Sequence, residues 1–132
     1  MSRGKTTIVL PAYREKENLE VLVPQILAEL NGQLEEVLII DDYSGDKTEE
    51  LQRLERVKVF TRKDTRGLGT AIFLGIHIAR TPYVIIMDAD GQHPTKCLPS
   101  IIENLNSNNL VVGSRYISEG GTLGWSLFRK IG

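Results

Sequence analysis

The sequence predicts an α/β protein of three layers, in which a mostly parallel, twisted sheet lies between two layers of helices. Short apolar segments rich in β-branched residues recur along the chain, and each is continuous rather than alternating, as in strands buried on both faces. Segments with the helical spacing of apolar residues separate them. A chain of 132 residues, 41% hydrophobic and 25% charged, is typical of one soluble domain.

The predicted strands and helices alternate along the chain. The strands are Thr6–Leu10, Val37–Ile40, Val57–Thr61, Tyr83–Met87 and Leu110–Val112. The helices are Leu19–Leu30, Thr48–Leu54, Ala71–Ala79 and Cys97–Leu105. Pro24 lies inside the first helix and is expected to kink or break it. Right-handed crossovers place the helices on both faces of the sheet and the functional loops at the carboxyl ends of the strands.

Composition excludes several classes of function. Sixteen Lys and Arg against seventeen Asp and Glu leave a net charge of −1, so nucleic acid is not an expected partner. The apolar segments are far shorter than the roughly 20 residues that cross a bilayer. The N-terminus lacks the features of a signal peptide, which predicts a cytoplasmic location. Cys97 is the only cysteine, so we expect no internal disulfide and no cysteine-rich zinc site.

An acidic cluster follows the fourth predicted strand. Asp88 and Asp90 are two residues apart, which in extended chain places them on one side, and Gln92 adds an amide oxygen after Gly91. Such hard oxygen ligands suit Mg²⁺ or Mn²⁺, which are bound by one or two carboxylates together with substrate phosphates. The alternative is an acidic turn that caps the next helix. Its position at the end of a buried strand favours the metal site and implies a diphosphate substrate.

A glycine-rich turn precedes the third predicted helix. Gly67 and Gly69 suggest a dinucleotide-binding turn, but Ile72 stands where the third glycine of that motif belongs. A dehydrogenase is therefore not expected, and no Walker A sequence occurs. The basic residues before this turn, Arg62, Lys63 and Arg66, fit either a phosphate contact or a solvated loop.

Several segments together resemble a known family. Pro11–Glu15, Asp41–Thr48, Gly67–Ala71 and Asp88–Pro94 resemble, in this order, the signatures of family 2 glycosyltransferases. The last of these, with Gly113–Tyr116, Gly120–Gly121 and Trp125–Arg129, is most similar to dolichol-phosphate (polyprenyl-phosphate) mannosyltransferases. The resemblance covers essentially the whole chain. It implies a GT-A fold, a nucleotide-sugar donor with GDP-mannose favoured, Mg²⁺ or Mn²⁺, a dolichyl or polyprenyl phosphate acceptor, and inversion at the anomeric carbon.

The resemblance also implies roles for individual residues. The nucleotide-sugar site would comprise Pro11, Ala12, Tyr13, Glu15, Ile40, Asp42, Asp88, Ala89, Asp90 and Arg115. The metal ligands would be Asp88, Asp90 and Gln92, and the residues of the catalytic step would be Asp90, Arg115 and Arg129. Arg129 has a second interpretation, an exposed cation in the last turn of a helix. His93 is expected to be structural rather than a phosphate ligand, and His77 to be a core or partly buried residue.

The chain departs from the family pattern in two turns and in length. Arg14 stands where the family usually has Asn, and Tyr43 where it has Gly, which puts the shape of both turns in question. Family catalytic domains generally continue well beyond this length. Residues 1–132 are therefore expected to be a single nucleotide-sugar-binding domain truncated at its C-terminus. The apolar segment Leu123–Ile131 is expected to be a helix, and is the nearest candidate for a surface that accepts the prenyl chain.

Partners and location follow from the same resemblance. A membrane-anchoring subunit or a missing C-terminal membrane region would hold the domain peripherally at the cytosolic face of a membrane. Two alternatives to the mannosyltransferase remain. One is a polyprenyl-phosphate glucosyltransferase that uses UDP-glucose, and the other is a nucleotide-sugar-binding domain without turnover. Release of nucleoside diphosphate in the presence of a short polyprenyl phosphate would separate an enzyme from a binding domain.

Overall fold

The structure, a computed structural model, describes residues 4–64, 66–90, 95–103, 109–113 and 125–130. Its elements, in chain order, are β1 (Thr6–Ala12), α1 (Lys16–Glu29), β2 (Leu34–Asp41), the 3₁₀ helix η1 (Thr48–Arg53), β3 (Val57–Thr61), α2 (Leu68–Ile78), β4 (Tyr83–Ile86), the 3₁₀ helix η2 (Thr95–Cys97), α3 (Leu98–Glu103), β5 (Asn109–Gly113) and β6 (Trp125–Lys130). All five predicted strands are present, and the order of strands and helices confirms the α/β class.

The strands of the described chain form one six-stranded sheet in the order β3-β2-β1-β4-β5-β6. The pairs β1·β2, β1·β4, β2·β3 and β4·β5 are parallel, and β6 is antiparallel to β5. The central strand β1 is buried along its whole length except for Pro11. The sheet is therefore mostly parallel, and its inner strands are covered on both faces, as the continuous apolar segments predict.

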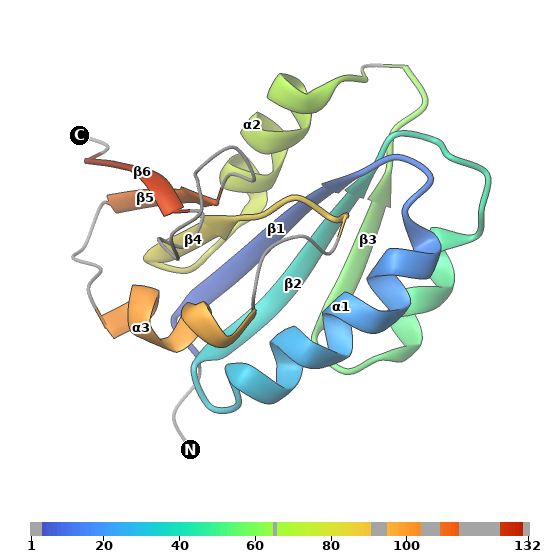
Figure 1. Cartoon of the computed structure of the whole chain (residues 1–132). Coiled ribbons are helices and arrows are strands. Elements are labelled where there is room, and N and C mark those ends of the chain that lie inside the picture. The colour runs from blue at the N-terminus through green and yellow to red at the C-terminus, as the bar shows by residue number, and fades with distance from the viewer. Residues whose placement is uncertain (1–3, 65, 91–94, 104–108, 114–124, 131–132) are drawn as a thin grey trace.

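Helices cover both faces of the sheet (Figure 1). On one face α1, η1 and α3 enclose the larger core, in which Ile8, Leu10 and Ile39 of the sheet meet Leu19, Leu51 and Leu98. On the other face α2 packs against a smaller cluster that contains Val9, Leu38, Ile40 and Ile86. The three layers are those expected from the sequence.

The expected break in the first helix does not occur. α1 runs without interruption through Pro24, which is exposed on its outer side, while Leu22, Val23 and Ile26 are buried. Pro24 has no N–H to donate to the carbonyl of Glu20, and its exposure puts this missing bond on the solvent side of the helix. Burial of the apolar face keeps the helix continuous.

The predicted helix near the C-terminus is wrong, because residues 125–130 form strand β6. This strand pairs with β5 from Asn109↔Lys130 to Gly113↔Trp125, with a register shift after Val112. A short apolar segment fits both periodicities, so spacing alone does not separate helix from strand. Pairing with β5 satisfies backbone groups on both strands, which an isolated short helix would not do.

The outer edge of β3 is covered by η1. The N–H of Val59 donates to Oε1 of Gln52 at 2.9 Å, and the N–H of Val57 donates to the carbonyl of Leu54 at 3.3 Å. These two backbone N–H groups at the outer edge of β3 therefore donate to residues of the segment just before the strand.

None of the helices in the described part of the chain combines the length and apolar character needed to span a bilayer. The longest, α1, has 14 residues.

Close packing of α2 on the sheet depends on Gly75. A methyl group at this position would collide with both methyl groups of Val9, which is fully buried. We expect Gly75→Ala to lower the free energy of unfolding by about 1–3 kcal/mol, because the stiff valine has no free volume to enter. The matched control is Gly69→Ala in the same helix, where nothing lies within 4 Å of the new methyl group. This variant should gain up to about 1 kcal/mol from helix propensity. Chemical denaturation measures both, and equal effects would contradict the assigned packing.

Candidate functional site at the carboxyl edge of the sheet

The loops after β1, β2, β3 and β4 begin at one edge of the sheet. Backbone hydrogen bonds continue beyond the strands: Asp42 N–H donates to the Ala12 carbonyl at 3.0 Å, and Arg62 N–H to the Asp41 carbonyl at 2.8 Å. Met87 N–H likewise donates to the Val9 carbonyl at 3.1 Å. The polar segments singled out in the sequence therefore start side by side, as expected for the carboxyl ends of parallel strands.

Two predicted site residues lie next to each other in the sheet. Pro11 pairs with Ile40 in the register of β1 and β2, and Ala12 pairs with Asp41. Ile40 is fully buried and Pro11 half-buried, so together they form the floor beneath the loops rather than the loops themselves.

Asp42 is held by Arg62 and by the glycine-rich turn. Arg62 donates from Nε and Nη2 to Oδ1 of Asp42 at 2.8 and 2.5 Å, and Gly67 N–H donates to Oδ2 at 2.7 Å. Arg62 also donates to Oγ1 of Thr70 and to the Gly67 carbonyl, each at 2.9 Å. The side chains are only 9% (Arg62) and 14% (Asp42) exposed. This ion pair is therefore largely desolvated and ties the turn before α2 to the end of β2.

The Asp42–Arg62 pair changes the interpretation of both residues. Arg62 has most of its N–H groups bound within the protein, so a phosphate contact is not the role that this geometry favours. Asp42 has a fixed orientation, and within the described residues its Oδ2 accepts a hydrogen bond from Gly67, which leaves room for a second donor on that oxygen. A ring N–H of a nucleobase could occupy that position.

Aromatic and basic side chains form the rim of this edge. Tyr13 and Tyr43 are 47% and 50% exposed. The guanidinium groups of Arg14 and Arg66 lie 5.2 and 5.8 Å from the ring centre of Tyr13, and the ammonium of Lys63 lies 5.6 Å from that of Tyr43. Arg66 Nε also donates to the Asp42 carbonyl at 3.1 Å. Exposed rings next to cations suit a ligand with a flat base and negative phosphates.

The two departures from the family pattern fall on left-handed backbone. Arg14 has a φ of 58° and Tyr43 a φ of 62°. Asn and Gly, the family's usual residues there, adopt this conformation most readily. Both turns thus have left-handed backbone at residues that disfavour it, at a cost of about 1–2 kcal/mol for each residue.

Asp41, Ser44 and Asp46 were not predicted as site residues, yet they join the first two loops. Asp41 is buried and accepts hydrogen bonds from the backbone N–H of Ser44, at 3.0 Å, and from its hydroxyl. Ser44 Oγ accepts from Arg14 N–H at 2.8 Å, and Asp46 accepts from Lys16 N–H at the start of α1 at 3.2 Å. The run of acidic and hydroxyl residues after β2 was the available signal, because these residues favour turns and caps.

The expected carboxylate pair follows β4 but not in fully extended chain. β4 ends at Ile86, and Ala89 and Asp90 lie in a turn, so the assumed same-side spacing of Asp88 and Asp90 does not carry through. Both carboxylates are half-buried, with buried Ala89 between them. In the described chain no third His, Cys, Asp or Glu completes a metal cluster with them. Two hard carboxylates still fit Mg²⁺ or Mn²⁺, which obtain further ligands from water and phosphate.

Other predicted residues lie outside the region whose side chains the structure describes. Gln92, His93 and Arg115 are outside the described residues. Arg129 belongs to strand β6, of which the backbone alone is described. His77 is exposed on α2, so the expectation of a core histidine is wrong. It falls on the outer side of the helix, whereas Ala71 and Gly75 face the sheet.

Two surface ion pairs fasten α1 to η1 beside the site. Lys16 pairs with Glu50, and Glu20 with Arg53, each at 2.6 Å. Their hydrogen bonds lower the pKa of Glu50 and Glu20 and raise the pKa of Lys16 and Arg53. A lowered carboxyl pKa stabilises the fold at pH values above the unfolded pKa, and this contribution is lost as the pH falls through the folded one. Because the four side chains keep between 23% and 55% of their surface exposed to solvent, the contribution is small.

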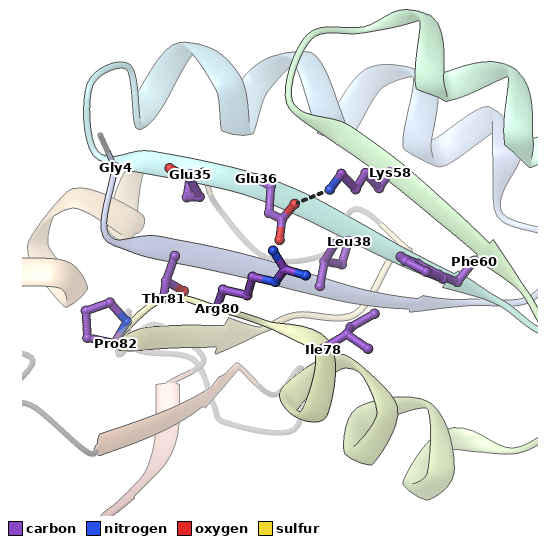
Figure 2. A pocket seen from close by; sticks show the side chains of 10 residues that line it. All are labelled: Gly4, Glu35, Glu36, Leu38, Lys58, Phe60, Ile78, Arg80, Thr81 and Pro82. Atoms are coloured by element: carbon purple, nitrogen blue, oxygen red, sulfur yellow. Dashed lines mark ion pairs between the residues drawn. The ribbon is translucent and has the colours of Figure 1, made fainter. Parts of the chain in front are cut away.

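One pocket adjoins the candidate site and a second lies away from it. One of about 520 Å³ adjoins the rim and is lined by Arg14, Lys16, Glu17, Asn18, Ser44 and Asp46. A larger one of about 650 Å³ lies near the amino ends of β1 and β4, beside the C-terminal end of α2 (Figure 2). The larger pocket is therefore separate from the carboxyl edge.

Comparison with known proteins adds sequence relationships to this geometry. Residues 7–131 match the family model described as "Glycosyl transferase family 2". A dolichol-phosphate mannosyltransferase of Pyrococcus furiosus is 36% identical over 132 residues, which are 96% of this chain and 38% of that protein. One of Saccharomyces cerevisiae is 31% identical over 134 residues, 95% of this chain and 50% of that protein. The chain thus spans half the length of these relatives or less.

Solved structures share the fold. The mannosyltransferase PcManGT from Pyrobaculum calidifontis, in complex with GDP-Man and Mn²⁺, has a TM-score of 0.57 and 25% identity, covering 68% of this chain and 28% of that one. A 4-diphosphocytidyl-2C-methyl-D-erythritol synthase has a TM-score of 0.56 at 15% identity, covering 96% of this chain and 72% of that one. The second similarity concerns the fold alone.

Proposed function

The chain belongs to glycosyl transferase family 2, and from this we propose that it is the donor-binding part of a glycosyltransferase that moves mannose from GDP-mannose to a dolichyl or polyprenyl phosphate. The observation that carries the proposal is the carboxyl edge, where Tyr13, the fixed carboxylate of Asp42, and Asp88 with Asp90 follow neighbouring strands. The mannosyltransferase relatives and the neighbour bound to GDP-Man support mannose and guanine over other sugars and bases.

The nucleoside end of the donor would lie on the rim. The exposed ring of Tyr13 offers a flat apolar surface, and Oδ2 of Asp42 offers an acceptor for a ring N–H. Arg62 and Gly67 hold that carboxylate in place before the nucleotide arrives, which lowers the entropy lost on binding.

The diphosphate would lie near the end of β4. Asp88 and Asp90 would hold Mg²⁺ or Mn²⁺, with Gln92 as the third ligand predicted from the sequence, and the cation would neutralise charge on the departing nucleoside diphosphate. These carboxylates act as ligands and not as acids or bases. Arg115 and Arg129 are predicted phosphate contacts, because a guanidinium binds phosphate oxygens in pairs.

The acceptor needs no general base. A phosphate monoester is already ionised at pH 7, whereas a sugar hydroxyl must lose a proton to attack. The protein would therefore act by aligning the acceptor oxygen behind the anomeric carbon, and an in-line displacement inverts that centre. Such an acceptor lies in a membrane, which supports peripheral association with its cytosolic face. The names of the similar proteins do not support the membrane-anchoring subunit expected from the resemblance.

Calorimetric titration tests the donor assignment. We expect the chain to bind GDP-mannose in the presence of Mn²⁺, and to bind UDP-glucose more weakly, because the similar proteins are mannosyltransferases and one of them holds GDP-Man and Mn²⁺. Transfer of labelled mannose to a short polyprenyl phosphate tests the reaction. Tighter binding of UDP-glucose would favour the glucosyltransferase alternative. Donor binding without transfer would favour a domain that binds nucleotide sugars but has no turnover of its own.

A further inference from the structure

The hydroxyl of Thr70 lies at the far end of a chain of hydrogen bonds that leads to Asp42. Thr70 is the third residue of α2, and its Oγ1 is 2.9 Å from Nη1 of Arg62 and 3.1 Å from the carbonyl oxygen of Gly67. The buried residues of α2 are Ala71 and Gly75, whereas Thr70 is exposed. The core therefore does not need this side chain, and its hydrogen bonds are what distinguish it from other exposed residues.

The direction of these hydrogen bonds follows from the chemistry of the two side chains. A guanidinium group only donates, so Thr70 Oγ1 accepts from Arg62 Nη1. The hydroxyl proton then remains for the carbonyl of Gly67. A valine at this position would have the shape of threonine but neither function, and a serine would keep both.

The guanidinium of Arg62 has a partner at each of its three nitrogens. Nε and Nη2 donate to Oδ1 of Asp42, Nη2 also donates to the Gly67 carbonyl, and Nη1 donates to Thr70. Because the group is planar and rigid, contacts on three sides fix its orientation. In the described part of the chain Thr70 is the one partner of Nη1, so loss of its hydroxyl would free that end of the group.

The orientation of Arg62 determines what the carboxylate of Asp42 offers to a ligand. Oδ1 accepts two hydrogen bonds from Arg62, which occupy both of its lone pairs, while Oδ2 accepts from Gly67 N–H at 2.7 Å. Within the described residues, one acceptor position is left, on Oδ2. A ligand N–H finds this position only while the carboxylate keeps its orientation, since hydrogen bonds weaken steeply when they bend.

We propose that Thr70 is a positioning residue for recognition of the nucleobase, because it orients Arg62 and Arg62 orients Asp42. This inference rests on the proposed function and adds to it a residue that does not touch the donor. The acceptor position on Oδ2 suits one ring N–H, such as that of guanine. Loss of the Thr70 hydroxyl weakens this base contact and leaves the contacts to the phosphates, near the end of β4, unchanged.

Competition against labelled GDP in the presence of Mn²⁺ tests the proposal. It gives the affinities of GDP and of ribose 5-diphosphate, which lacks the base, and the ratio of the two reports the contribution of the base. Thr70→Val should lower this ratio about threefold to tenfold, the effect of one hydrogen bond. Thr70→Ser should restore the ratio of the parent chain. Thr70→Ala, which favours the helix, should show the same loss as valine and replaces it if that variant does not fold.

The matched control is Thr81→Val, at the other end of the sheet. The Thr81 hydroxyl lies 2.7 Å from that of Thr7 and 2.8 Å from the carbonyl of Tyr83, next to the amino ends of β1 and β4. This variant loses the same group but should keep the ratio. A second measurement needs no nucleotide: in nuclear magnetic resonance spectra, the Nε proton of Arg62 should exchange with water faster in Thr70→Val and not in Thr81→Val.

The outcomes separate this inference from the proposed function. A Thr70→Val variant that keeps the parent ratio, or a loss that Thr70→Ser does not restore, would overturn the role of Thr70 and leave the donor assignment intact. An unchanged exchange rate of the Arg62 Nε proton in Thr70→Val would do the same. A parent chain that binds GDP no better than ribose 5-diphosphate would overturn the proposed base site, and this inference with it.

Discussion

Exchange of Asp90 for asparagine is expected to reduce metal-supported binding and transfer of GDP-mannose about 100-fold. Asp88 and Asp90 follow β4 at the carboxyl edge, and two carboxylates near a diphosphate repel it unless a cation lies between them. Asparagine keeps the size of the side chain but removes the negative charge that holds the cation. Removal of metal from the parent chain with EDTA should have an effect of similar size, which titration calorimetry with and without Mn²⁺ measures.

The control for this substitution is Asp64→Asn in the exposed loop before α2, which changes the net charge equally. It should leave donor affinity and its dependence on Mn²⁺ unchanged. Donor binding that persists without metal, and that Asp90→Asn does not weaken, would remove the basis for a metal site at Asp88 and Asp90.

Replacement of Asp42 by alanine is expected to lower the free energy of unfolding by about 3 kcal/mol. The variant would leave the guanidinium of Arg62, whose side chain is 9% exposed, without its carboxylate partner. Gly67 N–H would lose its acceptor as well, which loosens the turn before α2. Urea denaturation of the parent chain and the variant measures the loss.

A double-mutant cycle separates the ion pair from other effects of the substitution. If the pair accounts for the loss, Asp42→Ala combined with Arg62→Met should cost less than the sum of the single changes. The comparison pair is Glu20 and Arg53, which lies at the exposed surface, and Glu20→Ala should cost much less than Asp42→Ala. Additive losses in the cycle would contradict the close pairing of Asp42 with Arg62. Asp42→Asn preserves the shape of the side chain but removes its charge and one of its two acceptor oxygens, so it tests the ion pair without a loss of packing.

Most of the fold follows from local patterns in the sequence. Continuous apolar segments identify the inner strands, because a strand covered on both faces has no polar side, and β1 is such a strand. Trp125–Lys130 was misassigned because a short apolar segment has no unique period, and its partner β5 decides the outcome. Pro24 was expected to kink or break α1, and the helix is continuous because the burial of Leu22, Val23 and Ile26 outweighs one missing hydrogen bond on the solvent side.

The candidate site was predictable in its location but not in its internal contacts. The polar residues after β1, β2 and β4 indicate the edge, since parallel strands end on the same side. That Arg62 binds Asp42, 20 residues earlier, depends on how β3 lies beside β2, which composition and spacing do not specify. Arg14 and Tyr43 are similar cases, because their left-handed backbone is imposed by loops that Asp41 and Ser44 hold together.

The covered edge of β3 is expected to lower the tendency of the chain to aggregate. An unpaired strand edge is a template on which another chain can add a strand, and this is a common route to aggregation. Here the donors of Val57 and Val59 are already bound by Leu54 and Gln52 of the preceding segment. An incoming strand would have to displace η1 before it could pair with β3. The 3₁₀ helix η1 thus hinders strands of other chains from pairing with this edge of the sheet at high protein concentration.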